Sequence, residues 1–542
     1  MQSKILHVAG VLLTGSLLLS TQAMAGGSHQ QRFSTFIDKY WSDNDLPPWQ
    51  CRFIPKASPL FLPHCMQAEN VTYHLQQLQN IADAHEGTRA AGLPGYESSV
   101  SYITDTLSAV GYDVKLLPFD FNAFYEIADG ALIALVPEAV EYVWDEDFGY
   151  LSQTEAGDVS GPVMAVDLEL GEGNASSSGC EAEDFDGFEP GAIALIQRGS
   201  CAFQQKAENA AAAGAIGAII FNQGDSDDRT GLINATLSSD YSGGIPVLFA
   251  TYENGVAWSE TEGLELRMVV DVLREMRSVN NIIAESKWGD DENVVVLGAH
   301  LDSVFAGPGI NDNGSGSAGI LEMALLLKNA HTKNKIRYAW WGAEEAGLVG
   351  STQYVLGLEP EELAKIKVYL NFDMIGSPNA YYGIYDGDGS AFELEGPPGS
   401  AATEALFEQY FNIRGLPFEG SEISFRSDYA QFFEEGIAFG GLFTGAEEIK
   451  TEEQAELYGG EAGLAFDPCY HSSCDDISNL DQRALEVNAD AIAYVTAVLA
   501  NSTSAIDEEI DNSELPDLNA QNLTLKSSVS YDKSHWGKYW IK

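Results

Sequence analysis

Two histidines and several carboxylates follow short apolar runs of the sequence, in positions where metal chemistry could be done. In chain order these candidates are His300, Asp312, Glu344, Glu345, Asp373 and His471. Imidazole nitrogens together with Asp and Glu oxygens are ligands that zinc takes in proteins. Five ligands that share one carboxylate are typical of a pair of ions about 3.5–4 Å apart. The residue types therefore predict a hydrolase with two metal ions.

The position of each ligand candidate predicts its role. Asp312 lies in a loop rich in Gly and Asn, where the backbone can approach closely, and this suits a carboxylate that bridges both ions. His300 and Asp373 would complete the coordination of one ion. Glu345 and His471 would complete that of the other.

Two further carboxylates are expected to assist these ligands. Only one side chain of the Glu344-Glu345 pair can point squarely at a metal ion, so we assign Glu344 as the general base for the attacking water. Asp302 stands two residues after His300, where its carboxylate could accept the second imidazole N–H and fix the tautomer.

These side chains need a framework that brings the ends of several strands together. Apolar runs at 293–299, 336–341 and 368–372 predict strands, and periodic stretches at 317–329, 350–357 and 484–499 predict helices. Their alternation predicts an α/β fold, with a mainly parallel, mixed sheet flanked by helices on both faces. Ligands of such sheets bind beyond the carboxyl ends of the strands, where the candidates stand.

The length of 542 residues exceeds what one core supports. Short β-rich runs separated by Gly, Ser and Asp set residues 128–275 apart from both flanks and predict a distinct α+β unit. The predicted organisation is a signal peptide (1–25), a lead-in (26–70), a first part of the main domain (71–127), the α+β unit (128–275), a catalytic part (276–502) and a tail (503–542).

The net charge limits the possible partners, and the N-terminal segment indicates the cellular destination. A net charge of −53 makes nucleic acid and anionic membrane surfaces poor partners. Lys4, an apolar stretch at 8–19 and Ala23-Met24-Ala25 form a secretory signal that is too short to span a membrane. We therefore expect a secreted protein, extracellular or periplasmic in transit, without a membrane partner.

Six cysteines fit an oxidising compartment. They fall into three local pairs, Cys51 with Cys65, Cys180 with Cys201 and Cys469 with Cys474. We expect these pairs to form disulfides, although the sequence leaves other connectivities open.

Five blocks, in order and at sensible intervals, closely resemble the M28 family of co-catalytic zinc aminopeptidases, above all its secreted bacterial leucyl-type members. The blocks lie at 300–303, 307–316, 340–345, 371–374 and 469–474. The segment from 199 to 222 resembles a protease-associated (PA) domain, which in this family would be inserted within the peptidase domain. The resemblance implies a zinc exopeptidase (phosphorylase/hydrolase-like) fold.

The resemblance also implies further site residues. Tyr470 would donate its hydroxyl to the oxyanion of the tetrahedral intermediate. Glu344, Asp373 and the main-chain carbonyl of Arg426 would hold the free amine of the substrate. Phe443 would line a hydrophobic pocket for the N-terminal side chain, and the bridge between Cys469 and Cys474 would hold the loop of Tyr470.

The family further implies two zinc ions per chain and peptide substrates with a free N-terminus, with a preference for large apolar residues such as Leu. Some relatives bind calcium near the last helix, where Glu486 and Asp490 stand here, and calcium stays open. Tyr429 replaces a usual His after Arg426-Ser427-Asp428, which puts the local pocket shape in question. We expect a monomer.

Three other functions remain as alternatives. A glutaminyl cyclase or a carboxypeptidase could use the same scaffold, and a cyclase typically works with one zinc. A non-catalytic binding protein would have lost ligands, whereas all five candidates and the base are present here.

Overall fold

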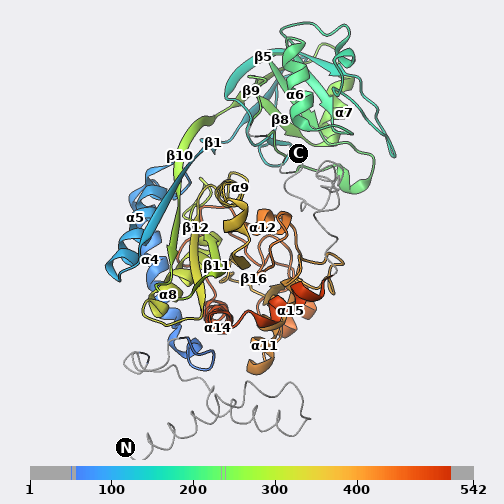
Figure 1. Cartoon of the computed structure of the whole chain (residues 1–542). Coiled ribbons are helices and arrows are strands. Elements are labelled where there is room, and N and C mark those ends of the chain that lie inside the picture. The colour runs from blue at the N-terminus through green and yellow to red at the C-terminus, as the bar shows by residue number, and fades with distance from the viewer. Residues whose placement is uncertain (1–50, 52–56, 234, 239, 514–542) are drawn as a thin grey trace, which may run out of the picture.

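The computed structural model describes residues 51, 57–233, 235–238 and 240–513, which form two β-sheets with their own helices (Figure 1). The predicted signal peptide, most of the lead-in and residues 514–542 lie outside this part of the chain. The predicted domain boundaries stay predictions.

The larger sheet is the mixed, mainly parallel sheet that the sequence predicts. Its eight strands follow the order β1-β10-β12-β11-β13-β16-β14-β15, and β12, β11, β13 and β16 run parallel. The strands are β1 (Val114–Glu126), β10 (Val272–Glu285), β11 (Asp290–His300), β12 (Asn334–Trp341), β13 (Ile366–Phe372), β14 (Gly383–Tyr385), β15 (Glu419–Ser421) and β16 (Phe439–Phe443).

Helices cover both faces of this sheet. A core cluster joins one face to α4, α5, α8, α11, α14 and α15, and a second cluster joins the other face to α9 and α12. The elements are η1 (Pro63–Cys65), α4 (Ala68–Ala84), α5 (Pro94–Ala109), η4 (Ile310–Ser315), α8 (Gly316–Leu327), α9 (Val349–Leu356), α10 (Pro360–Leu363), α11 (Ser400–Arg414), α12 (Ala430–Glu434), α13 (Glu452–Tyr458), α14 (Gln482–Leu499) and α15 (Ser504–Asn512).

The central strands end at one edge, and this alignment positions the site. Residues 294–299 of β11 are buried without interruption, as expected for a parallel strand covered on both faces. The register pairs His300 with Trp341, the last residues of β11 and β12. The polar residues that follow β11, β12 and β13 therefore emerge side by side.

The smaller sheet is an insertion between β1 and β10, which pair along their whole length from Val114 with Ala284 to Glu126 with Val272. These two strands run from the larger sheet toward the smaller one (Figure 1). The smaller sheet has the order β3-β2-β9-β5-β6-β7-β8-β4. Its elements are β2 (Ala131–Val136), β3 (Val140–Glu141), β4 (Phe148–Tyr150), β5 (Gly157–Val166), η2 (Ala182–Phe185), β6 (Ile193–Gln197), α6 (Phe203–Ala212), β7 (Gly217–Phe221), η3 (Asp227–Arg229), β8 (Val247–Ala250), α7 (Tyr252–Glu260) and β9 (Glu265–Val270).

The structure also shows the cysteine pairing and the start of the region predicted as a tail. All three local cysteine pairs are disulfides, which confirms the expected pairing. The region predicted as a tail begins with α15, and its Ile506 is fully buried in the main core, although no core pattern was evident in this short segment. Within the described residues, each helix is too short or too polar to cross a bilayer.

Candidate active site

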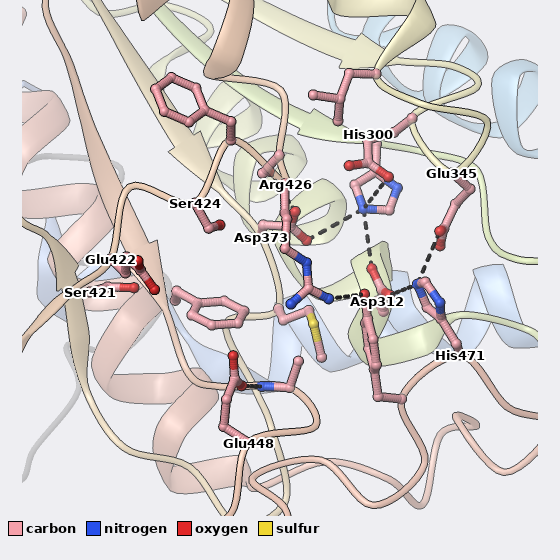
Figure 2. A pocket seen from close by; sticks show the side chains of 18 of the residues that line it. His300, Asp312, Glu345, Asp373, Ser421, Glu422, Ser424, Arg426, Glu448 and His471 are labelled. Atoms are coloured by element: carbon pink, nitrogen blue, oxygen red, sulfur yellow. Dashed lines mark hydrogen bonds and ion pairs between the residues drawn. The ribbon is translucent and has the colours of Figure 1, made fainter. Parts of the chain in front are cut away.

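The five predicted metal ligands converge at the strand ends of the larger sheet (Figure 2). Asp312 lies between the two histidines, with Oδ1 3.1 Å from His300 Nε2 and Oδ2 3.3 Å from His471 Nε2. Asp373 Oδ1 lies 3.4 Å from His300 Nε2, and Glu345 Oε2 lies 3.1 Å from His471 Nε2. Residues from five separate segments thus form two adjoining groups that share one carboxylate.

The donor set fits a pair of zinc ions. In each group, His300 with Asp312 and Asp373 or His471 with Asp312 and Glu345, candidate ligand atoms lie within 4.8 Å of one another. Asp373 Oδ1 and Glu345 Oε1 are buried and accept no hydrogen bond from the described protein atoms, so both are available to a cation. The individual ligand roles stay predictions.

The charges of the site act on one another strongly. Although burial opposes the shift, the carboxylates of Glu345 and Asp312 raise the pKa of His471 to about 10. Although burial again acts in the opposite direction, hydrogen bonds from both imidazoles lower the pKa of Asp312. The carboxylates thus stabilise the protonated imidazole in this structure. A bound cation would be attracted by the same carboxylates, because they attract any positive charge placed among them.

Glu344 lies beside the ligands. Its Oε2 is 3.9 Å from His300 Nε2, and the residue is buried. Burial, followed by the neighbouring carboxylates Glu345 and Asp428, raises the pKa of Glu344 well above its ordinary value. A carboxylate with a raised pKa is suited to accept a proton and release it again near neutral pH.

Asp302 acts through different atoms from those predicted. His300 Nδ1 lies 3.1 Å from the main-chain oxygen of Asp302, whereas the Asp302 carboxylate is 3.8 Å away. The carboxylate accepts the backbone N–H groups of Glu344 and Glu345, each at 3.3 Å. The main chain therefore orients the imidazole, and the side chain fixes the Glu344-Glu345 loop.

Arg89 is a supporting residue that the sequence-based reasoning missed. It is fully buried, and its guanidinium donates to the main-chain oxygens of Leu301, Pro308 (2.8 Å) and Gly309 (2.6 Å). These acceptors lie on both sides of the turn between His300 and Asp312. One side chain thus ties down the loop that carries the bridging carboxylate, and no local sequence signal marks this role.

Two more residues support Asp312 and Asp373, one through the backbone and one through the carboxylate. Asp475 accepts the backbone N–H groups of Asn311 (2.8 Å) and Asp312 (2.9 Å). Ser427 donates its hydroxyl to Asp373 Oδ2 at 2.6 Å, which leaves the other oxygen turned toward His300. Asp475 directly follows the segment between Cys469 and Cys474 that carries His471. This proximity to a predicted ligand was the sequence signal that could have identified Asp475.

Tyr470 is held at both ends of its ring. The ring stacks on His471 with 3.8 Å between centroids, and the hydroxyl accepts a hydrogen bond from Arg426 Nη2 at 3.1 Å. Arg426 Nη1 in turn pairs with Glu447 at 2.7 Å. The resemblance pointed to the main-chain carbonyl of Arg426, and its guanidinium contact with Tyr470 is an addition from the structure.

Tyr429, the departure from the usual His, supports the same segment. It is fully buried and accepts the backbone N–H of Phe425 at 2.8 Å. Its ring stacks on Phe439 of β16 with 4.8 Å between centroids. Tyr429 therefore links the turn before Arg426 to β16.

A cavity of about 480 Å³ opens onto the metal ligands. Glu344, Arg426, Phe443 and Tyr470 all line it, so the structure brings together the predicted site residues. Arg426 is labelled in Figure 2 beside Asp373 and Asp312. Segments of the smaller sheet's unit line the same cavity.

The position considered for calcium already holds a cationic side chain. Arg414 Nη1 pairs with Asp490 Oδ2 at 2.9 Å, and Arg483 lies 3.8 Å from Glu486. Each of the two acidic residues is therefore paired with a guanidinium group.

Comparison with known proteins identifies the family. The model of peptidase family M28 matches residues 281–496, and that of the PA domain matches residues 159–258. An aminopeptidase of Pseudomonas aeruginosa is 58% identical over 532 residues, which cover 97% of this chain and 98% of that protein. The chain belongs to peptidase family M28. The predictions of this family, of its fold and of a metallo-aminopeptidase are confirmed.

More distant relatives are also aminopeptidases. Leucine aminopeptidase 2 of Trichophyton tonsurans is 41% identical, covering 84% of this chain and 88% of its own. The solved aminopeptidase from Aneurinibacillus sp. strain AM-1 superposes with a TM-score of 0.60 at 25% identity, covering 79% of this chain and 93% of its own. A zinc aminopeptidase from Bacillus subtilis gives a TM-score of 0.55 at 25% identity, covering 79% and 94%.

Removal of the Arg89 guanidinium should destabilise the M28 domain. Arg89→Met removes a donor from three buried carbonyls, and it leaves those of Leu301 and Pro308 without one, because the Gly309 oxygen still accepts the backbone N–H of Gly314. Two unsatisfied buried acceptors should cost at least about 2 kcal/mol of unfolding free energy. Thermal unfolding measures the loss, and Arg483→Met, which removes an exposed guanidinium, is the matched control. Equal melting temperatures for the two variants would contradict the role given to Arg89.

Proposed function

We propose that the protein is an exported aminopeptidase with two zinc ions per chain, which hydrolyses the first peptide bond of peptides and prefers a large apolar N-terminal residue such as Leu. The observation that carries this proposal is the position of Asp312. Its two oxygens face two imidazoles, and each imidazole has a carboxylate of its own, Asp373 or Glu345. This arrangement supports two cations that share one bridging ligand.

The side chains around the ligands supply the remaining steps. Bound zinc would polarise the scissile carbonyl and lower the pKa of a coordinated water to about 7. Glu344 takes the proton from the attacking water and passes it to the leaving amine. Tyr470 accepts a hydrogen bond from Arg426, so its own O–H proton is left to point at the developing oxyanion.

The same cavity explains a preference for N-terminal residues. The free amine would be held by Glu344, Asp373 and the carbonyl of Arg426, so an internal peptide bond would bury these groups without a partner. Phe443 lies edge-on to Tyr381 with 6.4 Å between centroids, and these rings form an apolar wall. A leucine-sized side chain would bury its surface there.

Export is supported by the sequence and by the disulfides. Residues 1–25 have the pattern of a cleaved secretory signal. The three disulfides fit an oxidising compartment, because thiols stay reduced in the cytosol. Export is tested by sequencing the N-terminus of the protein recovered outside the cytoplasm, which should begin near Gly26.

Metal analysis of the purified chain, together with an amide panel, tests the activity. We expect two zinc ions per chain, hydrolysis of leucinamide at neutral pH, loss of activity after chelation and recovery when zinc is added. One zinc with cyclisation of N-terminal glutamine would favour a cyclase. Release of C-terminal residues would favour a carboxypeptidase, and binding without turnover would favour a non-catalytic protein.

Glu344→Ala should retain both zinc ions and lose turnover. The side chain adjoins the ligands and is assigned as the proton acceptor, so kcat should fall by about 10³-fold. Glu345→Ala is the matched variant and should lose metal, because Glu345 faces His471. Loss of zinc from Glu344→Ala with zinc retained in Glu345→Ala would reverse the two assignments.

Arg426→Met should lower kcat for leucinamide by about tenfold and change KM little. The guanidinium positions the Tyr470 hydroxyl, which acts in the transition state rather than in substrate binding. In a Tyr470→Phe background the same substitution should have no further effect on kcat. Additive losses in the double variant would show that Arg426 acts independently of Tyr470.

A further inference from the structure

The active-site cavity is built from both sheets' units. Besides the residues of the M28 domain, its lining includes two segments of the insertion, Ser152 with Gln153 and residues 236–238. The first segment follows β4, and the second precedes β8. In Figure 1 the unit that carries them lies above α9 and α12.

The two segments form one hydrogen-bonded wall. Ser152 N donates to the Ala235 oxygen and Leu237 N donates to the Ser152 oxygen, both at 2.9 Å. Leu237 is fully buried in a core of the insertion. Because each segment is tied to the other and to that core, the wall has a fixed shape.

Arg274 of β10 clamps this wall to the strands that lead to the M28 domain. Its guanidinium donates to Gln153 Oε1 at 3.3 Å and to the Tyr241 oxygen at 2.8 Å, and it pairs with Glu155. Gln153 has a φ of +68° and is 5% exposed, so a strained residue is held at the cavity. Strain of this type persists where surrounding contacts impose it.

The chemistry of the wall suits the peptide main chain. Its side chains are Ser152, Gln153, Thr236, Leu237 and Ser238, none of which carries a charge. Elsewhere the lining includes the carboxylates of Glu419, Glu422 and Glu448. The lining guanidinium, that of Arg426, already pairs with Glu447. The lining residues of the wall therefore offer a substrate carboxylate no cationic partner.

We infer that the inserted PA domain supplies the subsites for the residues after the scissile bond, and that these subsites accept the uncharged main chain of peptides longer than two residues. This inference rests on the proposed function. The groups assigned to the amine and to the N-terminal side chain all belong to the M28 domain, so the wall of the insertion faces the remainder of the peptide. A dipeptide would place its terminal carboxylate against a wall that carries no cationic side chain of its own, whereas a longer peptide carries that charge outward.

Three substrates test the inference, namely leucinamide, Leu-Ala and Leu-Ala-Ala-Ala. The wild-type protein should hydrolyse the tetrapeptide with a kcat/KM about tenfold above that for Leu-Ala. Arg274→Met should lower kcat/KM for the tetrapeptide by about tenfold and leave that for leucinamide within about twofold, because leucinamide does not reach the wall. Arg267→Met removes an exposed guanidinium of the same insertion and should change neither value.

Ser238→Trp provides a second test that does not depend on the Arg274 clamp. The added ring should fill the wall's part of the cavity and lower tetrapeptide hydrolysis selectively. Equal rates for Leu-Ala and the tetrapeptide, or an equal loss on all three substrates in both variants, would overturn the inference while leucinamide hydrolysis upholds the proposed function. If the zinc-loaded wild type cleaves no leucinamide, the proposed function fails and the inference falls with it.

Discussion

The repulsion among buried carboxylates is the constraint on which the rest of this site depends. Asp312 and Glu344 are buried beside Glu345 and Asp373, and the charge that His300 and His471 can supply does not balance them. Like charges at this separation are costly in a low-dielectric interior unless cations lie between them. The framework must therefore hold these loops in place against the repulsion, and the same carboxylates would attract the metal ions that we propose.

Backbone anchors provide that resistance. Arg89 ties the turn between His300 and Asp312, and the Asp302 carboxylate holds the backbone of the Glu344-Glu345 loop. Arg89 comes from the loop between α4 and α5 and Asp302 from the end of β11, so the loops that carry the predicted ligands are held by segments far away in the chain. The insertion between β1 and β10 adds a wall to the same cavity, so the cavity extends beyond the domain that holds the predicted ligands.

Several features followed from local pattern. The runs that became β11, β12 and β13 are mostly apolar, and predicted ligands stand at or just after their ends. In contrast, β16 contains Gly440 and Gly441 and gave no strand signal. A Cβ at Gly441 would lie 1.9 Å from the Asn371 oxygen, so glycine is required there by the neighbouring strand rather than by the segment itself.

The sequence alone determined the residue types, their order and the strand ends that carry them, because hydrophobic periodicity and ligand chemistry are local properties. Only the tertiary structure decided which atoms meet. His300 contacts the main-chain oxygen of Asp302 rather than its carboxylate. Arg414 pairs with Asp490, and Arg426 donates a hydrogen bond to Tyr470 through its guanidinium. Such contacts depend on distances between segments far apart in the chain, and no local pattern encodes those distances.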